Sequence, residues 1–391
     1  MLRAASALAV VSLLALAGCG KRDRNAAEDR SQAARPRPAG PLGVVAEVRG
    51  EAMLVGDAGR FALIVERRRW FDAAGGALRE RPELSAPLAR TLADLEPFAE
   101  VHLGSAPVVV GGEEHHEQHI RLEPAPRPIA VTGIVVEIAM AGPGEELWRT
   151  EHELRTELAS FDGQATTMTT TTTMMTTTPI PALLRIGPDA NHRSPVQAKL
   201  CAQPRIIDLV GVVTAGAGSR IDALVTECND ATPIRIVSYR WPGPRASVTT
   251  LASPAELGFR PERLVVTPRG EAVVVGTRAG QLAIGRVGTD HQVTVTTTLA
   301  GVSRVTTALA AVDASIWTLT LGASDDWIVA RDGVAVTLVD PTGSGDPEQL
   351  QPLQLASAPQ LGIVVLARSA TMRYLLATQP PAGPPLVITA R

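Results

Sequence analysis

A cluster of histidines and carboxylates is the part of this sequence best suited to binding a metal ion. It reads Glu113-Glu-His-His-Glu-Gln-His119. In an extended strand, His115, Glu117 and His119 would project to one side, and in a helix His115 and His119 would share a face. Imidazole and carboxylate groups are ligands for Zn²⁺ or Cu²⁺, so these three residues form the candidate metal site.

The same cluster has a simpler interpretation. Gly111 and Gly112 precede it and indicate a turn, and charged tips of hairpins are commonly solvated. The spacing also departs from that of a zinc-protease helix, because only one residue separates Glu117 from His119. We therefore favour a solvated loop and no bound cofactor, and keep a divalent metal as the alternative.

Two of the three cysteines could form a disulfide bond. Cys201 and Cys228 would close a loop of fewer than thirty residues, which in an oxidising compartment would stabilise the fold by about 3 kcal/mol. Two free thiols remain the alternative, because the sequence does not place the Cβ atoms. Neither cysteine has a histidine nearby, and the nucleophile patterns Gly-x-Ser-x-Gly and Ser-x-x-Lys are absent. An enzymatic function is therefore not favoured.

Two glycine-containing loops resemble ligand loops only in part. Gly216-Ala-Gly218 lacks the third glycine and the following helix of a dinucleotide site, so a hairpin turn is expected. The segment from Asp340 to Asp346 has oxygen ligands for Ca²⁺, but it lacks the ligand pattern of an EF-hand. An ordinary connecting loop is expected there. Trp317 and Trp327 flank a turn and are expected to be core aromatics.

The elements that would position these residues repeat along the second half of the chain. Short runs of Val, Ile, Leu and Thr alternate with turns rich in Gly, Pro, Asp and Arg. One copy contains four strands in about forty residues, starting at Arg263. Repeat units start near 207, 263, 308 and 361, which is a spacing typical of four-stranded propeller blades.

Because of this repeat spacing and the alternation of short strands with turns, the body resembles a β-propeller. The resemblance implies a mainly β fold of about six or seven four-stranded blades with small helical insertions. The regular repeats cover 205–391. No WD40 or kelch signature accompanies them. Tandem β-sandwiches, or an α+β front domain followed by a β domain, are the alternatives.

The front part, 41–165, is less regular. Its first three strands look like a β-meander: Gly43 to Val48, Ala52 to Val55 and Phe61 to Val65. Ser85 is a candidate cap for a helix with Leu84, Leu88, Leu92 and Leu95 on one face. A second amphipathic segment, expected to be helical, runs from Glu145 to Leu158 and carries His152. The Thr/Met tract 166–178 has no alternation that would specify a packed face, so we expect a surface loop there.

The N-terminus predicts where the protein resides. Arg3 precedes an apolar stretch from Ala4 to Leu16 that is too short to span a bilayer, and Leu16-Ala-Gly-Cys19 follows it. This segment resembles a bacterial lipoprotein signal peptide. The resemblance implies that 1–18 is removed, that Cys19 is acylated, and that 19–40 is a flexible tether before the β-rich body 41–391. Gly20, rather than aspartate, after the cysteine favours the outer membrane, with the body facing the periplasm or the cell surface.

Charge and composition exclude nucleic acids and ligands, such as carbohydrates, that bind by stacking on aromatic rings. The formal net charge of −3 becomes −7 for residues 41–391, so no nucleic-acid surface is expected. The chain has 5 Trp, 2 Tyr and 5 Phe, too few for a platform of stacking rings. The scattered arginines are given no binding role.

Together these observations predict a membrane-anchored extracytoplasmic lipoprotein. Its function would be that of a protein-interaction or scaffold module of the cell envelope, with envelope proteins as partners and the membrane bound through Cys19. The alternative is a metal-dependent envelope hydrolase or lactonase-like propeller that uses the histidine cluster.

Overall fold

A computed structural model describes fifteen stretches of the chain, all within one compact unit from Ala39 to Arg391. The described residues are 42–57, 60–95, 99–103, 107–111, 118–122, 127–129, 134–141, 146–152, 181–186, 191–195, 205–214, 218–226, 231–240, 246–338 and 349–389. They form six four-stranded sheets and one five-stranded sheet.

Three four-stranded sheets come from the front half of the chain, and in each the strands are paired in sequence order. The first contains β2 (Ala52–Asp57), β3 (Arg60–Val65), β4 (Arg69–Ala74) and β5 (Ala77–Glu80). The second contains β6 (Glu100–His102), β7 (Val108–Gly111), β8 (Gln118–Arg121) and β9 (Arg127–Ile129). The third contains β10 (Ile134–Ala141), β11 (Glu146–His152), β12 (Pro181–Ile186) and β13 (Asn191–Pro195).

Three more four-stranded sheets follow with the same internal order. The fourth contains β14 (Arg205–Thr214), β15 (Gly218–Thr226), β16 (Ile234–Arg240) and β17 (Ala246–Thr250). The fifth contains β18 (Arg260–Val266), β19 (Ala272–Arg278), β20 (Gln281–Val287) and β21 (Val293–Ala300). The sixth contains β22 (Val302–Ala310), β23 (Ile316–Gly322), β24 (Trp327–Arg331) and β25 (Val334–Ala335).

The seventh sheet joins the two ends of the unit. It contains β26 (Gln351–Ala358), β27 (Gly362–Arg368), β28 (Arg373–Ala377), β1 (Gly43–Arg49) and β29 (Leu386–Thr389), in that order. β1 runs antiparallel to β28 and parallel to β29. The expected meander of the first three strands is therefore wrong for β1, which pairs with the end of the chain and not with β2.

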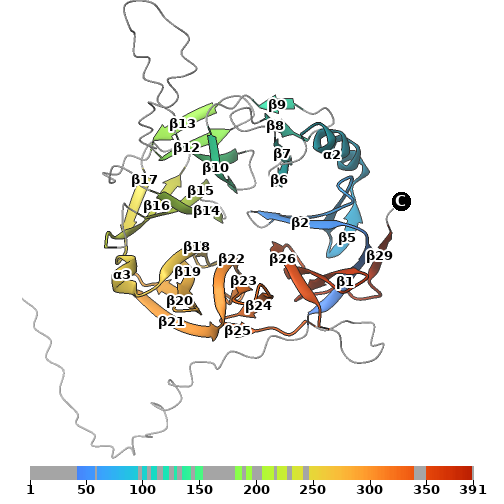
Figure 1. The fold of residues 1–391 in the computed structure, drawn as a ribbon. Coiled ribbons are helices and arrows are strands. Elements are labelled where there is room, and N and C mark those ends of the chain that lie inside the picture. The colour runs from blue at the N-terminus through green and yellow to red at the C-terminus, as the bar shows by residue number, and fades with distance from the viewer. Residues whose placement is uncertain are drawn as a thin grey trace, which may run out of the picture. The chain divides into compact units, whose positions relative to one another are not determined.

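The sheets form a closed ring. Contacts link their first strands in the order β2, β6, β10, β14, β18, β22, β26 and back to β2, and Figure 1 shows these strands nearest the centre. The predicted β-propeller is thus confirmed, with seven blades among the described residues. The alternative folds, tandem sandwiches and a separate front domain, are not what the structure shows.

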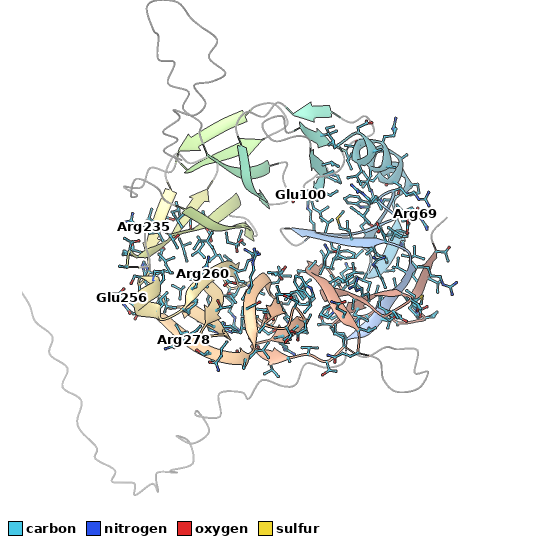
Figure 2. The ribbon with its side chains drawn as sticks, in the orientation of Figure 1. Arg69, Glu100, Arg235, Glu256, Arg260 and Arg278 are labelled. Atoms are coloured by element: carbon cyan, nitrogen blue, oxygen red, sulfur yellow. The ribbon has the colours of Figure 1, made fainter. Side chains whose placement is uncertain are left out.

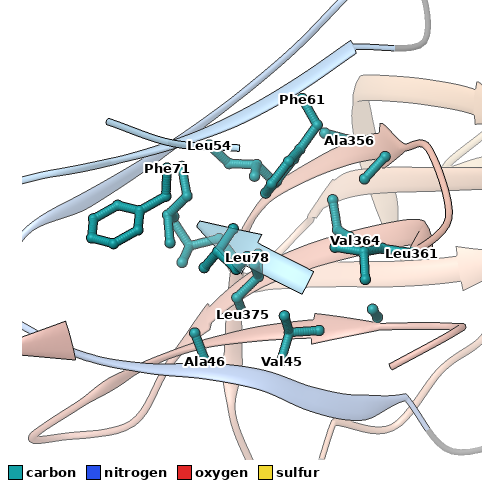
Figure 3. Packing of buried hydrophobic residues seen from close by; sticks show 14 of the residues in the cluster. Val45, Ala46, Leu54, Phe61, Phe71, Leu78, Ala356, Leu361, Val364 and Leu375 are labelled. Carbon is teal, nitrogen blue, oxygen red and sulfur yellow. The ribbon is translucent and has the colours of Figure 1, made fainter. Parts of the chain in front are cut away.

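The first, fifth, sixth and seventh blades bury both of their faces, which explains their uninterrupted apolar runs. In β19, Val273 and Val275 pack toward the sixth sheet, whereas Val274 packs toward the fourth. Side chains alternate between the faces of a strand, so a strand between two neighbours needs apolar residues at every position. Figure 3 shows the corresponding cluster between the first and seventh sheets, where Phe61 of β3 lies near Ala356 of β26.

Four hairpins use the same five-residue turn, at 267–271, 288–292, 311–315 and 322–326. In each, the first and last residues are joined by a backbone hydrogen bond, and a second bond spans three residues, as from Gly270 N–H to the Thr267 carbonyl at 2.8 Å. The fourth residue of each turn has a positive φ, and it is Gly270, His291, Ala314 or Asp325. The turns around Pro268 and Asp313 are therefore of one kind.

Hydrogen bonds from main-chain N–H groups to side-chain oxygens join neighbouring blades. A β-bulge interrupts the first strand in the last five blades, and in three of them a polar residue at the bulge accepts a hydrogen bond from the next blade. Asp208 Oδ2 accepts from Leu264 N–H at 2.6 Å. Glu262 Oε2 accepts from Val305 N–H at 2.6 Å, and Gln354 Oε1 accepts from Leu54 N–H at 2.6 Å. The last of these bonds closes the ring.

Two helices are described. α2 (Pro82–Leu95) buries Leu88, Leu92 and Leu95 as predicted, against the first and second sheets. Ser85 is not its cap, because the helix begins at Pro82; its hydroxyl instead accepts from Trp70 N–H at 3.0 Å. α3 (Pro254–Leu257) connects β17 to β18. Neither described helix has the length and apolar character needed to cross a membrane.

The helix expected from Glu145 to Leu158 is wrong where the structure describes it. Glu146–His152 is the strand β11, which pairs with β10 on one side and β12 on the other. Strand partners on both sides override the helical spacing of the leucines.

Candidate functional site

The predicted metal and cysteine residues lie largely outside the described residues. His115, Glu117, Cys19, Cys201 and Cys228 are all in undescribed segments. His119 is on β8, where its main chain pairs with Val110 and Ile129. In the part of the chain that the structure describes, no group of three or more His, Cys, Asp or Glu residues is arranged to hold a metal.

The two glycine loops and the tryptophan pair have simple structural roles where they are described. β14 and β15 are antiparallel, with Thr214 opposite Gly218, so the predicted hairpin is confirmed. The segment from Asp340 to Asp346 lies outside the described residues. Trp317 is buried and Trp327 packs against the same core cluster, as expected for core aromatics.

A distinctive surface feature of the described residues is a groove of about 950 Å³ on the edge of the ring where the first strands of the blades begin. It is lined by the start of β18, the start of β22, the turn after β19, α3 with the residues that follow it, and Ile207 and Thr226 of the fourth blade. The groove therefore draws on the fourth, fifth and sixth blades. Figure 2 shows Arg260, Arg278 and Glu256 in this part of the ring.

Four arginines line this groove, which we call the arginine groove. Arg260 begins β18, Arg278 ends β19, Arg304 lies on β22, and Arg263 lies further along β18. Arg260, Arg278 and Arg304 are exposed. Within the described residues, none of these three side chains makes a hydrogen bond or an ion pair. Their guanidinium groups are thus available to a ligand.

The fourth arginine has a structural role. Arg263 Nε donates to the carbonyl of Thr306 at 2.8 Å, and Nη1 donates to the carbonyl of Glu262 at 2.9 Å. Nη1 also lies 4.0 Å from Asp208 Oδ1. Arg263 therefore contacts the first strands of three consecutive blades. These contacts hold its side chain in place at the base of the groove.

The acidic residue in the groove is engaged within the protein. One oxygen of Glu262 accepts from Val305 N–H, and the other accepts from the Thr277 hydroxyl at 2.9 Å. Two hydrogen bonds disperse its negative charge and fix its position. The side chain is therefore held away from pairing with the three exposed arginines, and the groove keeps a net positive charge.

The wall formed by α3 is held by a capping box. Ser253 N–H donates to Glu256 at 2.8 Å, and the Ser253 hydroxyl accepts from Glu256 N–H at 3.2 Å. The first of these hydrogen bonds, with a further one from the hydroxyl, lowers the pKa of Glu256 below its usual value. Gly258 ends the helix at φ 68°, and the guanidinium of Arg278 packs over it.

A close approach of two main chains fixes the position of Arg260. Gly276 on β19 is paired with Pro261, beside the bulge of β18. A Cβ at residue 276 would overlap the carbonyl oxygen of Arg260. Only glycine fits at this position, so β18 and β19 can approach this closely at Arg260.

The arginine groove has side chains whose chemistry suits anions. Guanidinium groups donate paired hydrogen bonds to carboxylate or phosphate, and a concave surface lined by one sign of charge concentrates oppositely charged ligands. These arginines were given no role from the sequence, and the repeats do not mark them. Aligned on the bulges, Arg304 falls where Asp208, Arg263 and Gln354 stand in other blades, and Arg263 has a structural role.

No protein-family model matches the sequence, and no curated relative does. Among solved structures, virginiamycin B lyase from Staphylococcus aureus shares 13% identity at a TM-score of 0.43, covering 86% of this chain and 95% of that chain. A Quinonprotein alcohol dehydrogenase-like protein from Bacteroides thetaiotaomicron shares 11% at 0.43, covering 85% and 74%. The Dos1 propeller shares 7% at 0.42, covering 90% and 96%. No functional residue is transferred from these structures.

Proposed function

We propose that this protein is a membrane-anchored binding module of the cell envelope, which presents a rigid propeller to partner proteins. In this proposal Cys19 carries the lipid and residues 19–40 form the tether. Multiple acyl chains give stable anchoring, because each buried methylene adds about 0.8 kcal/mol. The outer membrane is the proposed location.

The observation that carries the binding role is the arginine groove. Arg260, Arg278 and Arg304 come from different strands, yet they share one recess with Arg263. Interblade hydrogen bonds to Asp208 and Glu262 hold the strands that carry them. Because the backbone is held before a partner binds, binding has to order only the side chains.

Crosslinking in native membranes tests this proposal. The full chain with a C-terminal tag is crosslinked and purified, and the captured proteins are identified by mass spectrometry. We expect one envelope protein in stoichiometric amount. Replacing all three exposed arginines with glutamine should lower its recovery about tenfold.

A charge-matched control separates the groove from net charge. Arg79, Arg90 and Arg269 are exposed and lie outside the groove, so their replacement with glutamine should leave recovery unchanged. Absence of any reproducible partner from the wild-type chain would contradict the proposed function.

The anchor is tested separately by Cys19→Ser. Loss of acylation should move the protein from the membrane fraction to the soluble fraction, because the acyl chains supply the membrane affinity. A variant that stays in the membrane fraction would contradict the lipid anchor. Metal analysis of the purified wild-type protein tests the hydrolase alternative, which stays a prediction because His115 and Glu117 lie outside the described residues.

A further inference from the structure

The arginine groove offers positive charge in a form suited to several anionic groups at once. Its exposed arginines stand at the start of β18, the end of β19 and the start of β22. One guanidinium group is enough to bind a single small anion. Three guanidinium groups spread over two blades instead match a ligand that carries several carboxylates along its length.

The rest of the lining favours a polypeptide. Pro254, Ala255 and Ala279 supply accessible apolar surface beside the arginines, and Ser303 supplies a hydroxyl oxygen. The volume of about 950 Å³ holds several amino-acid side chains. Phe259 is the one aromatic residue of the lining and is only 4% exposed. The described lining therefore provides no exposed ring for stacking a nucleobase.

The groove is also organised before any ligand binds. Arg263 and Glu262 are held by hydrogen bonds to other strands, and Gly276 fixes the backbone of Arg260. A preorganised site loses less free energy to ordering when an extended peptide is bound.

We infer that the arginine groove binds an acidic segment of a partner protein, whose carboxylates pair with Arg260, Arg278 and Arg304. This inference rests on the proposed binding function and names the chemistry of the partner. An anionic lipid headgroup shares part of that chemistry and is an outcome of the test.

The test measures fluorescence anisotropy of a fluorescein-labelled peptide of alternating Glu and Ala, eight residues long, added to the purified full chain in nonionic detergent. We expect saturable binding that weakens as salt is raised, because salt screens exposed charges. The variant Arg260→Gln/Arg278→Gln/Arg304→Gln should bind about tenfold more weakly or worse. The control Arg79→Gln/Arg90→Gln/Arg269→Gln should change affinity by less than about twofold.

Three comparisons define the specificity. The matched Gln-Ala peptide should not bind, and inorganic phosphate should compete only weakly. The full-length Cys19→Ser variant should not sediment with phosphatidylglycerol vesicles. Thermal unfolding of both triple variants should match that of wild type, because all six side chains are exposed.

The inference is overturned if the Gln-Ala peptide binds equally well, if both triple variants lose equal affinity, or if vesicles bind while the acidic peptide does not. Failure here is distinguishable from failure of the proposed function. If crosslinking still captures an envelope protein, only the acidic-segment inference falls. If crosslinking captures nothing, the binding function falls regardless of the peptide result.

Discussion

The side-chain oxygen of Gln354 accepts a hydrogen bond from the main-chain N–H of Leu54 at 2.6 Å, across 300 residues of sequence. The same kind of bond joins Asp208 to Leu264 and Glu262 to Val305, where the blades are consecutive in sequence. The junction between the last and first blades is thus built like an internal junction. The ring is therefore closed by a side-chain hydrogen bond between the last and first blades, as well as by the place of β1 in the last sheet.

Replacing Gln354 with leucine should destabilise the fold by about 1–2 kcal/mol, because the N–H of Leu54 loses its partner. Urea unfolding monitored by tryptophan fluorescence measures this change. Gln281 is exposed, so Gln281→Leu serves as the control and should have little effect. Equal effects of the two substitutions would show that the bond to Leu54 does not stabilise the closure.

The fifth strand of the last sheet should contribute through one buried side chain. Ile388 is 2% exposed and pairs with Val48, whereas its neighbour Val387 is 55% exposed. Ile388→Ala should therefore cost about 2–4 kcal/mol, and Val387→Ala less than about 0.5 kcal/mol. If chemical denaturation finds the two variants equally stable, β29 does not pack as described.

Gly276→Ala should destabilise the propeller by about 2–3 kcal/mol, because the new methyl group meets main-chain atoms of Arg260 that cannot move aside. It should also weaken binding of the acidic peptide by displacing Arg260. Gly280 has φ 76° and open space around its Cα, so Gly280→Asn should cost less than about 1 kcal/mol. Wild-type stability and affinity in Gly276→Ala would contradict this packing.

The ion pair between Arg69 and Glu80 should make stability depend on pH. Two hydrogen bonds from Arg69 lower the pKa of Glu80, and Arg69 Nη1 also donates to the Thr389 carbonyl at 3.0 Å. Because the pKa is lower in the folded state, the pair stabilises the fold above the pKa of the unfolded chain, which is about 4.3. That contribution is lost as the pH falls through the folded value.

Glu80→Gln should consequently cost less than about 1 kcal/mol at neutral pH, since both side chains are partly exposed. The difference from wild type should vanish in acid. Unfolding curves at both pH values measure it, with Glu271→Gln as an exposed control. A cost that persists in acid would mean that the carboxylate charge is not the cause.

Strand identity in the rear half was predictable because each strand carries its signal locally. Runs such as Ala272–Gly276 of β19 have no polar side chain, and tight turns with glycine or aspartate separate such runs. Partner choice is not local. The residues of β1 look like the first strand of a meander, but their partners Leu375 and Ile388 are more than 300 residues away.

The arginine groove was missed for a related reason. Arg260 and Arg304 are 44 residues apart in the sequence, and they become neighbours only because β18 and β22 are the first strands of adjacent blades. Residue type alone does not distinguish them from Arg263, which is held by hydrogen bonds. Aligning the repeats on their bulges does not separate the two roles either, because Arg263 and Arg304 both follow the bulge of their first strand.

The position of β1 between β28 and β29 sets the order of events during synthesis. β1 emerges among the first strands of the chain, but both of its neighbours are among the last to be made. Contacts so distant in sequence form slowly. The last blade therefore assembles after translation, and until then β1 keeps two open strand edges that are prone to pairing with other chains. A holding chaperone that covers extended apolar segments would shorten the time for which β1 is exposed.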